Sequence, residues 1–211
     1  MLKTLLTIGH STHTIEQFIS LLKQHRVQGV CDVRSVPFSQ HNPQFNRRPL
    51  TQKLQEAGLF YGFMGKELGA RSDNPSCYID GKVQYNYLAE EPAFVGGIKR
   101  LREGLKNYRV ALMCAERDPL TCHRTILVCR EMRSKDLKIE HILADGSIET
   151  NEDAERRLMA LMNLQPDMLS SEHDCIEQAY DRQASIIAYV KQPQDSSPGT
   201  TNEDIHDRLH E

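Results

Sequence analysis

The sequence contains no run of about 18 apolar residues, so we expect no membrane-spanning helix. Its first residues lead into strand-like sequence without a small-residue cleavage site, and the expected location is the cytoplasm. None of its six cysteines forms a CxxC pair, which argues against a zinc ribbon or treble clef. A chain of 211 residues does not need disulfides for stability, so free thiols are expected.

Two common catalytic motifs are missing as well. The sequence has neither a glycine-rich phosphate loop of the Walker type nor a GxSxG segment. Hydrolysis of nucleoside triphosphates and serine hydrolysis are therefore disfavoured.

Charged residues are plentiful and unevenly distributed. Residues 1–130 contain 18 basic side chains against 11 acidic ones, whereas residues 131–211 contain 8 against 18. A basic body favours an anionic ligand, although charged helix faces in solvent produce the same kind of bias.

Apolar segments of alternating pattern predict an α/β fold. A strand at 3–8, a helix at 15–24 that opens with a Thr14–Gln17 capping box, and a strand at 30–33 form a βαβ unit. Such a unit implies parallel strands. Further strands are expected at 59–63, 110–114 and 138–143, with helices at 49–57, 92–105 and 122–133.

The expected organisation has three parts. Residues 1–145 form an α/β domain with a mainly parallel sheet flanked by helices, and residues 146–191 form a C-terminal helical extension. Residues 192–211 lack an apolar stripe and are expected to be a disordered tail.

Polar side chains follow three of the predicted strands. The strand ends read Gly9-His10-Ser11, Asp32-Val33-Arg34 and Cys114-Ala115-Glu116-Arg117. Ligands of open parallel sheets bind beyond the carboxyl ends of the strands, so a site is expected there. Asp32 and Glu116 are candidates for general acid and base, with ion pairing to nearby arginines as the alternative.

The turn from Cys114 to Arg124 combines several features that are typical of functional sites. Thr121 is expected to be the N-cap of a helix, which places Cys122, His123 and Arg124 in its first turn. A helix N-terminus attracts an anion and lowers the pKa of a thiol, so Cys122 is a candidate nucleophile. Alternatively, Cys122 and Cys129 both face the core as inert small residues.

The same turn raises the question of a metal site. Cys114, Cys122 and His123 include residue types that bind zinc, and Cys114 can equally belong to the core or form a redox pair with Cys122. Adjacent side chains on a helix diverge by about 100 degrees, so Cys122 and His123 are not expected to share a metal. We therefore expect none.

Aromatic residues interleave with basic ones in and beside two long polar connections, at 35–48 and 64–84. This pattern fits a platform for nucleic acid, or aromatic anchors that fix the loops to the core. The residues concerned are Phe38, Phe45, Tyr61, Phe63 and Tyr78 among Arg34, Arg47, Arg48, Lys66 and Arg71.

Four spaced motifs resemble a known family. TIGHST (7–12), DVRSVPFS (32–39), KELGAR (66–71) and CAERDPLTCHR (114–124) are similar to the prokaryotic domain-of-unknown-function family 488 over roughly residues 4–145. The resemblance implies a compact α/β domain but no reaction. Ala70 departs from it, because the family commonly has a second glycine there. The positions that the resemblance emphasises are His10, Ser11, Asp32, Arg34, Gly69, Cys114, Glu116, Cys122, His123 and Arg124.

These observations support two hypotheses, and neither indicates a cofactor or an oligomeric state. The first is an enzyme acting on an anionic nucleotide or nucleic-acid substrate at the strand ends and the N-terminus of the Cys122 helix. The second is a non-catalytic module that binds nucleic acid or protein. For the enzyme, the catalytic candidates are Asp32, Glu116 and Cys122. Its substrate-binding candidates are His10, Ser11, Arg34, Arg71, Arg117, His123 and Arg124.

Overall fold

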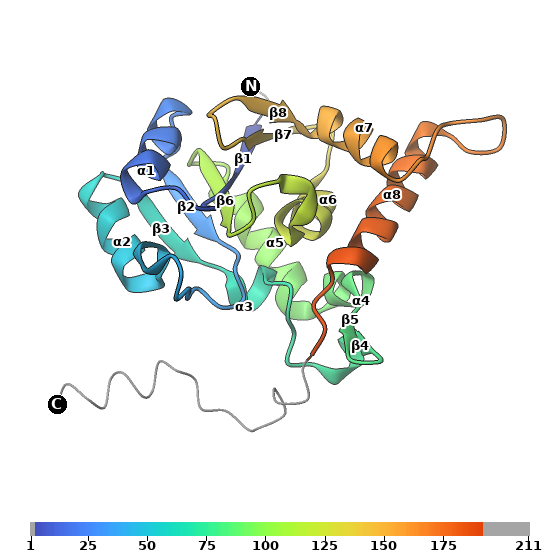
Figure 1. The fold of residues 1–211 in the computed structure, drawn as a ribbon, viewed down its shortest axis with the longest axis horizontal. Coiled ribbons are helices and arrows are strands. Elements are labelled where there is room, and N and C mark those ends of the chain that lie inside the picture. Colours follow the sequence, from blue (N-terminus) through green and yellow to red (C-terminus); the bar gives the residue numbers. More distant parts are fainter. Residues whose placement is uncertain (1–2, 192–211) are drawn as a thin grey trace.

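A computed structural model describes residues 3–191 of the chain (Figure 1). It has the expected α/β fold, in which helices flank a mainly parallel sheet and a long helix, α8 (Glu172–Ile187), follows at the C-terminal side. The tail predicted at 192–211 lies outside the described residues. In the described part, no helix is long and apolar enough to cross a membrane.

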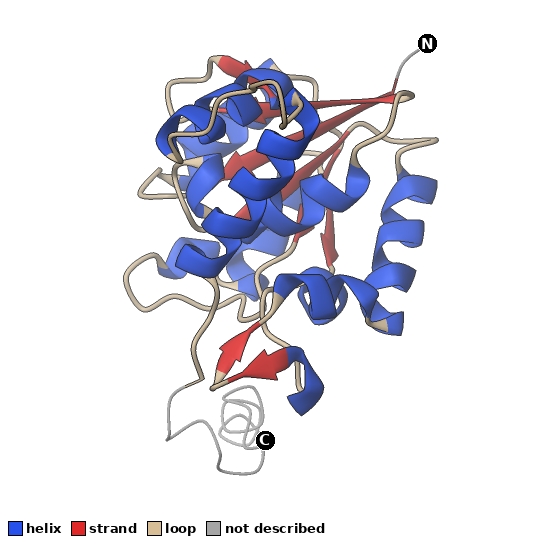
Figure 2. Ribbon diagram, turned by 90° about the vertical axis from the view of Figure 1, so that its right-hand side faces the viewer, coloured by secondary structure: helices blue, strands red, loops and turns tan. Residues whose placement is uncertain are grey.

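The described residues form one six-stranded sheet in the order β3-β2-β6-β1-β7-β8 and a separate two-stranded hairpin, β4-β5. Within the sheet, β8 alone is antiparallel to its neighbour. The hairpin lies apart from the sheet (Figure 2). The strands are β1 (Lys3–Gly9), β2 (Gly29–Asp32), β3 (Phe60–Phe63), β4 (Tyr78–Ile79), β5 (Lys82–Val83), β6 (Val110–Cys114), β7 (Leu137–Ile142) and β8 (Ile148–Thr150).

Helices cover both faces of the sheet because its buried strands alternate apolar side chains between the two faces. On one face, Leu6 and Ala111 pack against α1 and α2, while on the other Leu5 and Leu112 pack in a cluster with α5, α7 and α8. The remaining helices are α1 (Ile15–Gln24), α2 (Arg47–Glu56), α3 (Gly65–Leu68), α4 (Tyr85–Glu90), α5 (Pro92–Gly104), α6 (Arg130–Met132) and α7 (Asn151–Leu161). Short 3₁₀ turns lie at η1 (Pro43–Phe45), η2 (Pro75–Cys77) and η3 (Pro119–Thr121), and a π-helix at η4 (Arg124–Cys129).

Strand β6 lies between β1 and β2, so the carboxyl ends of these three strands are adjacent. The register aligns them, since Gly9 is paired with Cys114 and Asp32 with Met113. The backbone of β1 continues along β6 beyond the last pair, because the His10 N–H donates to the Cys114 carbonyl. All three polar strand ends predicted from the sequence therefore meet at one edge.

The C-terminal helices are tied to this sheet by buried polar side chains. Thr7 Oγ1 and His141 Nδ1 are hydrogen bonded at 2.9 Å, and His141 Nε2 lies 3.2 Å from Asn151 Oδ1. Glu155 Oε1 then accepts from Asn151 Nδ2 and from the Tyr180 hydroxyl, at 2.8 and 2.9 Å. Burial lowers the pKa of His141 to about 3, so this ring is neutral. The helical extension thus shares its core and its polar contacts with the α/β body.

Gly9 at the end of β1 is required by close backbone approach. A Cβ at this position would overlap the carbonyl oxygen of Glu116. We expect Gly9→Ala to lower the free energy of unfolding by about 2 kcal/mol, the usual order of overpacking a dense core. Urea denaturation followed by circular dichroism measures it.

Gly96→Ala is the matched control, because nothing lies within 4 Å of a Cβ added at this position in α5. Alanine is favoured over glycine inside a helix, so stability should rise by about 0.5–1 kcal/mol. Equal effects of the two substitutions would contradict the close-approach argument.

Candidate active site

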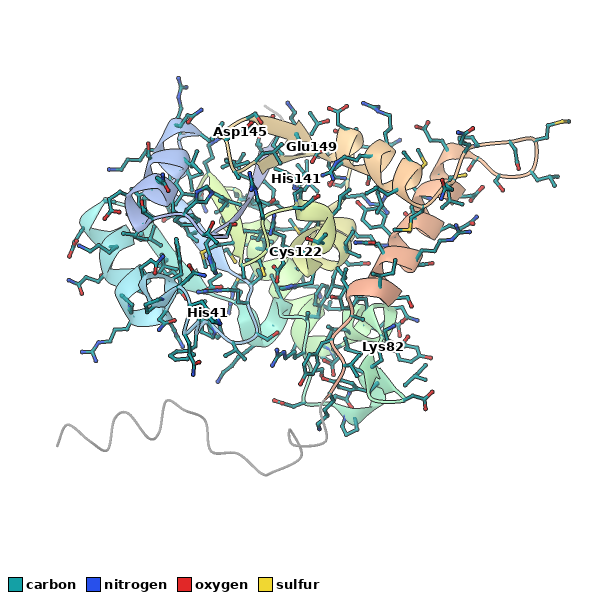
Figure 3. All side chains as sticks on the ribbon, in the orientation of Figure 1. His41, Lys82, Cys122, His141, Asp145 and Glu149 are labelled. Carbon is teal, nitrogen blue, oxygen red and sulfur yellow. The ribbon has the colours of Figure 1, made fainter. Side chains whose placement is uncertain are left out.

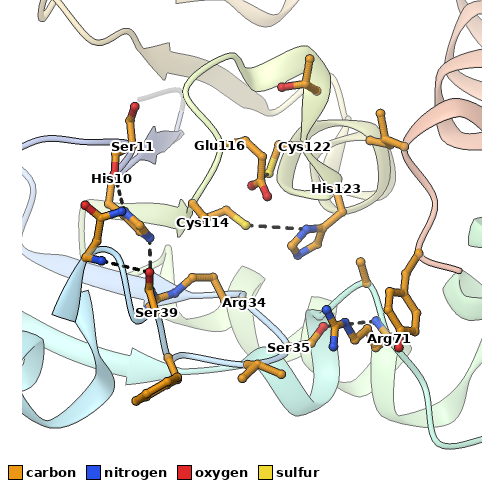
Figure 4. A pocket seen from close by; sticks show the side chains of 18 of the residues that line it. His10, Ser11, Arg34, Ser35, Ser39, Arg71, Cys114, Glu116, Cys122 and His123 are labelled. Atoms are coloured by element: carbon orange, nitrogen blue, oxygen red, sulfur yellow. Dashed lines mark hydrogen bonds between the residues drawn. The ribbon is translucent and has the colours of Figure 1, made fainter. Parts of the chain in front are cut away.

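The three adjacent strand ends surround a cavity of about 590 Å³ (Figure 4). Side chains from the turn after β1, from the loop after β2 and from the end of β6 with its following turn face one another across it. Cys122 lies near the middle of the molecule (Figure 3). The residues that line the cavity include seven of the ten expected at the site, namely His10, Ser11, Arg34, Arg71, Glu116, Cys122 and His123.

Asp32, Arg117 and Arg124 do not line the cavity. Asp32 is fully buried, and its carboxylate accepts from Arg34 Nε and Nη2 at 2.9 and 2.6 Å. The Tyr61 hydroxyl donates to the same carboxylate at 2.9 Å. Asp32 therefore positions Arg34, which is the ion-pair alternative considered from the sequence. The Asp32 contacts raise the pKa of Arg34 against the effect of its burial, so the guanidinium stays charged.

His10 is held as a neutral ring. It stacks on Phe45 with 4.4 Å between ring centroids, and Nε2 lies 3.3 Å from Arg34 Nη1. Burial and the charge of Arg34 lower the pKa of His10 to about 4, so at neutral pH its Nδ1 donates to the Ser11 carbonyl and its Nε2 accepts from Arg34. His10 thus orients Arg34 rather than adding a second positive charge.

Ser11 has a left-handed backbone, with φ at 46°. This conformation is uncommon for a residue other than glycine and concentrates at functional sites. It is maintained by the Ser11 N–H, which donates to the Ala115 carbonyl at 2.9 Å. The turn after β1 is therefore clamped onto the turn after β6.

The N-cap position belongs to Cys122, so the prediction of Thr121 is wrong. Asp118 starts the 3₁₀ turn η3 by accepting from the Leu120 N–H, and the Thr121 hydroxyl is used within that turn, donating to the Asp118 carbonyl. Cys122 follows with an extended backbone (φ −135°, ψ 138°), and its carbonyl accepts from the N–H of Thr125 and Ile126. Its Sγ accepts from the Arg124 N–H at 3.4 Å.

The expected divergence of Cys122 and His123 is wrong for the same reason. The helical run starts at His123, so the spacing of 100 degrees per residue does not apply to Cys122. The ligand atoms of Cys114, Cys122 and His123 lie within 4.8 Å of one another. These three side chains can therefore meet one metal ion, against the expectation drawn from the sequence.

Cys122 is buried, yet its sulfur contacts the carboxyl group of Glu116 in the cavity wall. Burial opposes its ionisation, but hydrogen bonding from Cys114 and the charges of Arg124 and His123 hold the pKa of Cys122 well below its ordinary value. Sγ donates to Glu116 Oε2 at 2.9 Å, and desolvation together with the neighbouring sulfur raises the pKa of Glu116. The two groups thus compete for one proton. Cys129, by contrast, is fully buried with a raised pKa, as a core residue is.

Arg124 stabilises the turn after β6 from the protein interior. Its side chain is fully buried, and its guanidinium donates to the carbonyls of Glu116 and Arg117 at 2.7 and 3.4 Å. No carboxylate pairs with it within residues 3–191. Arg124 is therefore a positioning residue that does not reach the cavity, and Arg117 contributes its backbone carbonyl.

The sequence did not indicate the contribution of the chain's later part to the cavity. Ile187 and Tyr189 line it beside Arg71, whose guanidinium carbon lies 4.1 Å from the centroid of the Tyr189 ring. Tyr85 forms another part of the wall and is buried. No short motif links residues this far apart, and an apolar or aromatic residue in a helical segment indicates only a packed face.

Comparison with known proteins identifies the family and nothing further. A family model described as a domain of unknown function, DUF488, matches residues 14–130. Neither the curated proteins nor the solved structures gave a match.

The lowered pKa of Cys122 predicts its reactivity with iodoacetamide. Alkylation requires the thiolate, whose fraction falls only as the pH drops through the pKa of the folded protein. In chelator-treated protein, we expect the rate at Cys122 to reach its plateau at a lower pH than the rate of an ordinary thiol does, and to decline as the pH is lowered further. Peptide mass spectrometry identifies the labelled residue.

Cys31 serves as the internal control, because burial raises the pKa of its thiol to about 12 and it should stay unlabelled. A rate at Cys122 that rises about 25-fold between pH 7 and pH 9 would show an ordinary thiol with a pKa of about 8.5 and contradict the prediction.

Proposed function

The chain belongs to the DUF488 family, and we propose that it is an enzyme that binds a small anionic substrate and attacks it with Cys122. One observation carries this proposal: the Cys122 sulfur and the Glu116 carboxylate lie 2.9 Å apart in the wall of the cavity. A nucleophile in contact with a group that exchanges its proton is the arrangement that covalent catalysis requires.

Two arginines supply positive charge for the substrate. Arg34 has five N–H donors, of which the partners Asp32, Phe45 and His10 occupy four, so one N–H of Nη1 remains. Arg71 is exposed at the other side of the cavity. Among the described side chains no carboxylate pairs with Arg71, which leaves it available to an anionic group.

The size of the cavity favours a small molecule over a duplex. Pockets for small molecules usually measure about 300–1,000 Å³, and this cavity of about 590 Å³ lies within that range. Ser11, Ser39 and Asn42 add polar groups to its wall, and Phe38 adds an aromatic one. A substrate of nucleotide size, with an anionic group and a planar ring, matches this lining.

The chemistry proceeds in two steps. The Cys122 thiolate forms a bond to an electrophilic carbon of the substrate, the bond from that carbon to the leaving group breaks, and the leaving group takes the proton from the Glu116 carboxyl. In the second step, a water molecule attacks the same carbon while the Glu116 carboxylate takes its proton. The carbon–sulfur bond then breaks and the thiolate is restored. The net reaction is hydrolysis.

The binding-module hypothesis has less support from the geometry. Of the aromatic residues expected to form a platform, Tyr61 donates to Asp32, Tyr78 donates to Ser72, and Phe63 lies under Arg47. These contacts are those of loop anchors. Phe38 alone of the five combines high exposure with a place in the cavity wall.

The location of the protein in the cytoplasm stays a prediction.

The proposal is tested with chelator-treated protein and a pool of nucleoside phosphates, sugar phosphates and acyl phosphates. Intact-protein mass spectrometry detects an adduct, and liquid chromatography detects the product. We expect Cys122→Ser to abolish both, and Glu116→Gln to slow turnover by about 10²–10⁴-fold, the usual contribution of a general acid or base. In Glu116→Gln the adduct should form more slowly and persist longer, because the first step needs the Glu116 carboxyl and release needs the carboxylate.

Cys129→Ser is the matched control, since this cysteine is the buried last residue of the π-helix and does not line the cavity. Circular dichroism is recorded for all three variants, and turnover is compared only among those that are folded, because a serine at a buried cysteine lowers stability. Turnover that survives in folded Cys122→Ser would refute the proposed chemistry. Salt-sensitive binding of nucleic acid that is unaffected by Glu116→Gln would favour the binding module instead.

A further inference from the structure

Three buried side chains around the turn after β6 converge on one point. Cys114 ends β6, Cys122 occupies the N-cap position and His123 begins the helical run, and their ligand atoms all lie within 4.8 Å of one another. The three residues are less than a tenth exposed. Figure 4 shows the Cys114 sulfur and the His123 ring directed toward each other, 3.7 Å apart at Sγ and Nδ1.

This spacing is close to what zinc requires. Zinc lies about 2.3 Å from a thiolate sulfur and about 2.0 Å from an imidazole nitrogen, which places two such atoms about 3.5 Å apart in a tetrahedral site. The observed 3.7 Å between Cys114 Sγ and His123 Nδ1 is already near that value. A metal ion therefore needs only small side-chain movements to be bound.

The orientation of His123 is determined by a backbone carbonyl. Its Nε2 lies 2.9 Å from the carbonyl oxygen of Val33 and donates to it, which directs Nδ1 at the Cys114 sulfur. A metal ion that binds there displaces the proton of Nδ1. Metal-binding histidines are commonly held in this way, with the second ring nitrogen donating to a carbonyl or carboxylate. The loop after β2 therefore prepares His123 as a ligand.

The surrounding charge suits two thiolates. The fully buried Arg124 has no carboxylate partner among the residues that the structure describes, and its backbone N–H already donates to Cys122 Sγ. A fixed positive charge beside the sulfurs favours the ionised form that binds metal. All three candidate ligands also line the cavity, so the fourth side of a tetrahedral ion would face the substrate space.

We propose that Cys114, Cys122 and His123 bind one Zn²⁺ ion, and that the bound ion holds the protein in a resting state. Zinc binding stands on the ligand geometry alone. The resting state rests on the proposed function, because a sulfur that coordinates zinc cannot attack a substrate. Removal of the ion releases the Cys122 sulfur without any oxidation or reduction.

The test uses the full-length protein, stripped of metal by dialysis against a chelator under reducing conditions. Co²⁺ is added first, because tetrahedral thiolate ligation gives a sulfur-to-cobalt charge-transfer band. Zn²⁺ then displaces it in competition with a chromophoric chelator. We expect one ion per chain, and a loss of affinity of more than about 100-fold in Cys114→Ser and in Cys122→Ser. Cys129→Ser, which alters a buried cysteine outside the cluster, should bind as the parent does.

Circular dichroism establishes that each variant is folded. Absence of the charge-transfer band in the parent protein overturns the zinc site. So does a Zn²⁺ affinity in folded Cys114→Ser and Cys122→Ser that equals the affinity of the parent. One equivalent of Zn²⁺ should also slow alkylation of Cys122 by at least about 10-fold, and excess chelator should restore the rate. Unchanged alkylation with one ion bound overturns the resting state.

The outcomes for the two proposals are separable. If the metal-free protein forms an adduct at Cys122 but binds no Zn²⁺, the zinc inference fails and the proposed function stands. If Zn²⁺ binds with the expected dependence on Cys114 and Cys122 but the metal-free protein forms no adduct, the proposed function fails and the metal site stands.

Discussion

The buried positive charge of Arg124 is the constraint on which the rest of the site depends. A guanidinium removed from water is costly unless its surroundings compensate it, and no carboxylate within residues 3–191 does so. Compensation comes instead from the carbonyls of Glu116 and Arg117, which fixes the course of the loop after β6. It comes also from the Cys122 sulfur, whose ionised form the charge favours. Gly9 is glycine because that same loop passes against β1.

The fold was largely predictable because its signals are local. The strands that became β1, β2 and β6 are short apolar runs with polar residues after them, and the capping box of Thr14 marks the start of α1. Strand order could not be derived in this way. It depends on pairings such as Leu6 with Ala111, which no local pattern records, and on packing of α7 and α8 against the same core as the sheet.

The site was predictable in its composition and not in its geometry. The rule for parallel sheets brought His10, Arg34 and Glu116 together correctly, because it depends only on where strands end. It could not distinguish Asp32, which is used to hold Arg34, from a carboxylate free to react. Thr121 has the right residue type for an N-cap, but the preceding Asp118 starts a 3₁₀ turn and moves the helix by one residue. That single step changed the direction of the Cys122 side chain.

The arrangement of the strands has a consequence for how the protein is made. Both neighbours of β1 in the sheet, β6 and β7, are synthesised more than 100 residues after it, and Tyr189 completes the cavity near the end of the described chain. Contacts of such long range form late, because the intervening chain must first lose its freedom. Strand β1 therefore stays unpaired until β6 and β7 have been synthesised. Cys122 meets Arg124, Glu116 and His123 in their final positions only after β6 and β7 have paired with β1, so a nascent chain that lacks these strands carries an ordinary thiol.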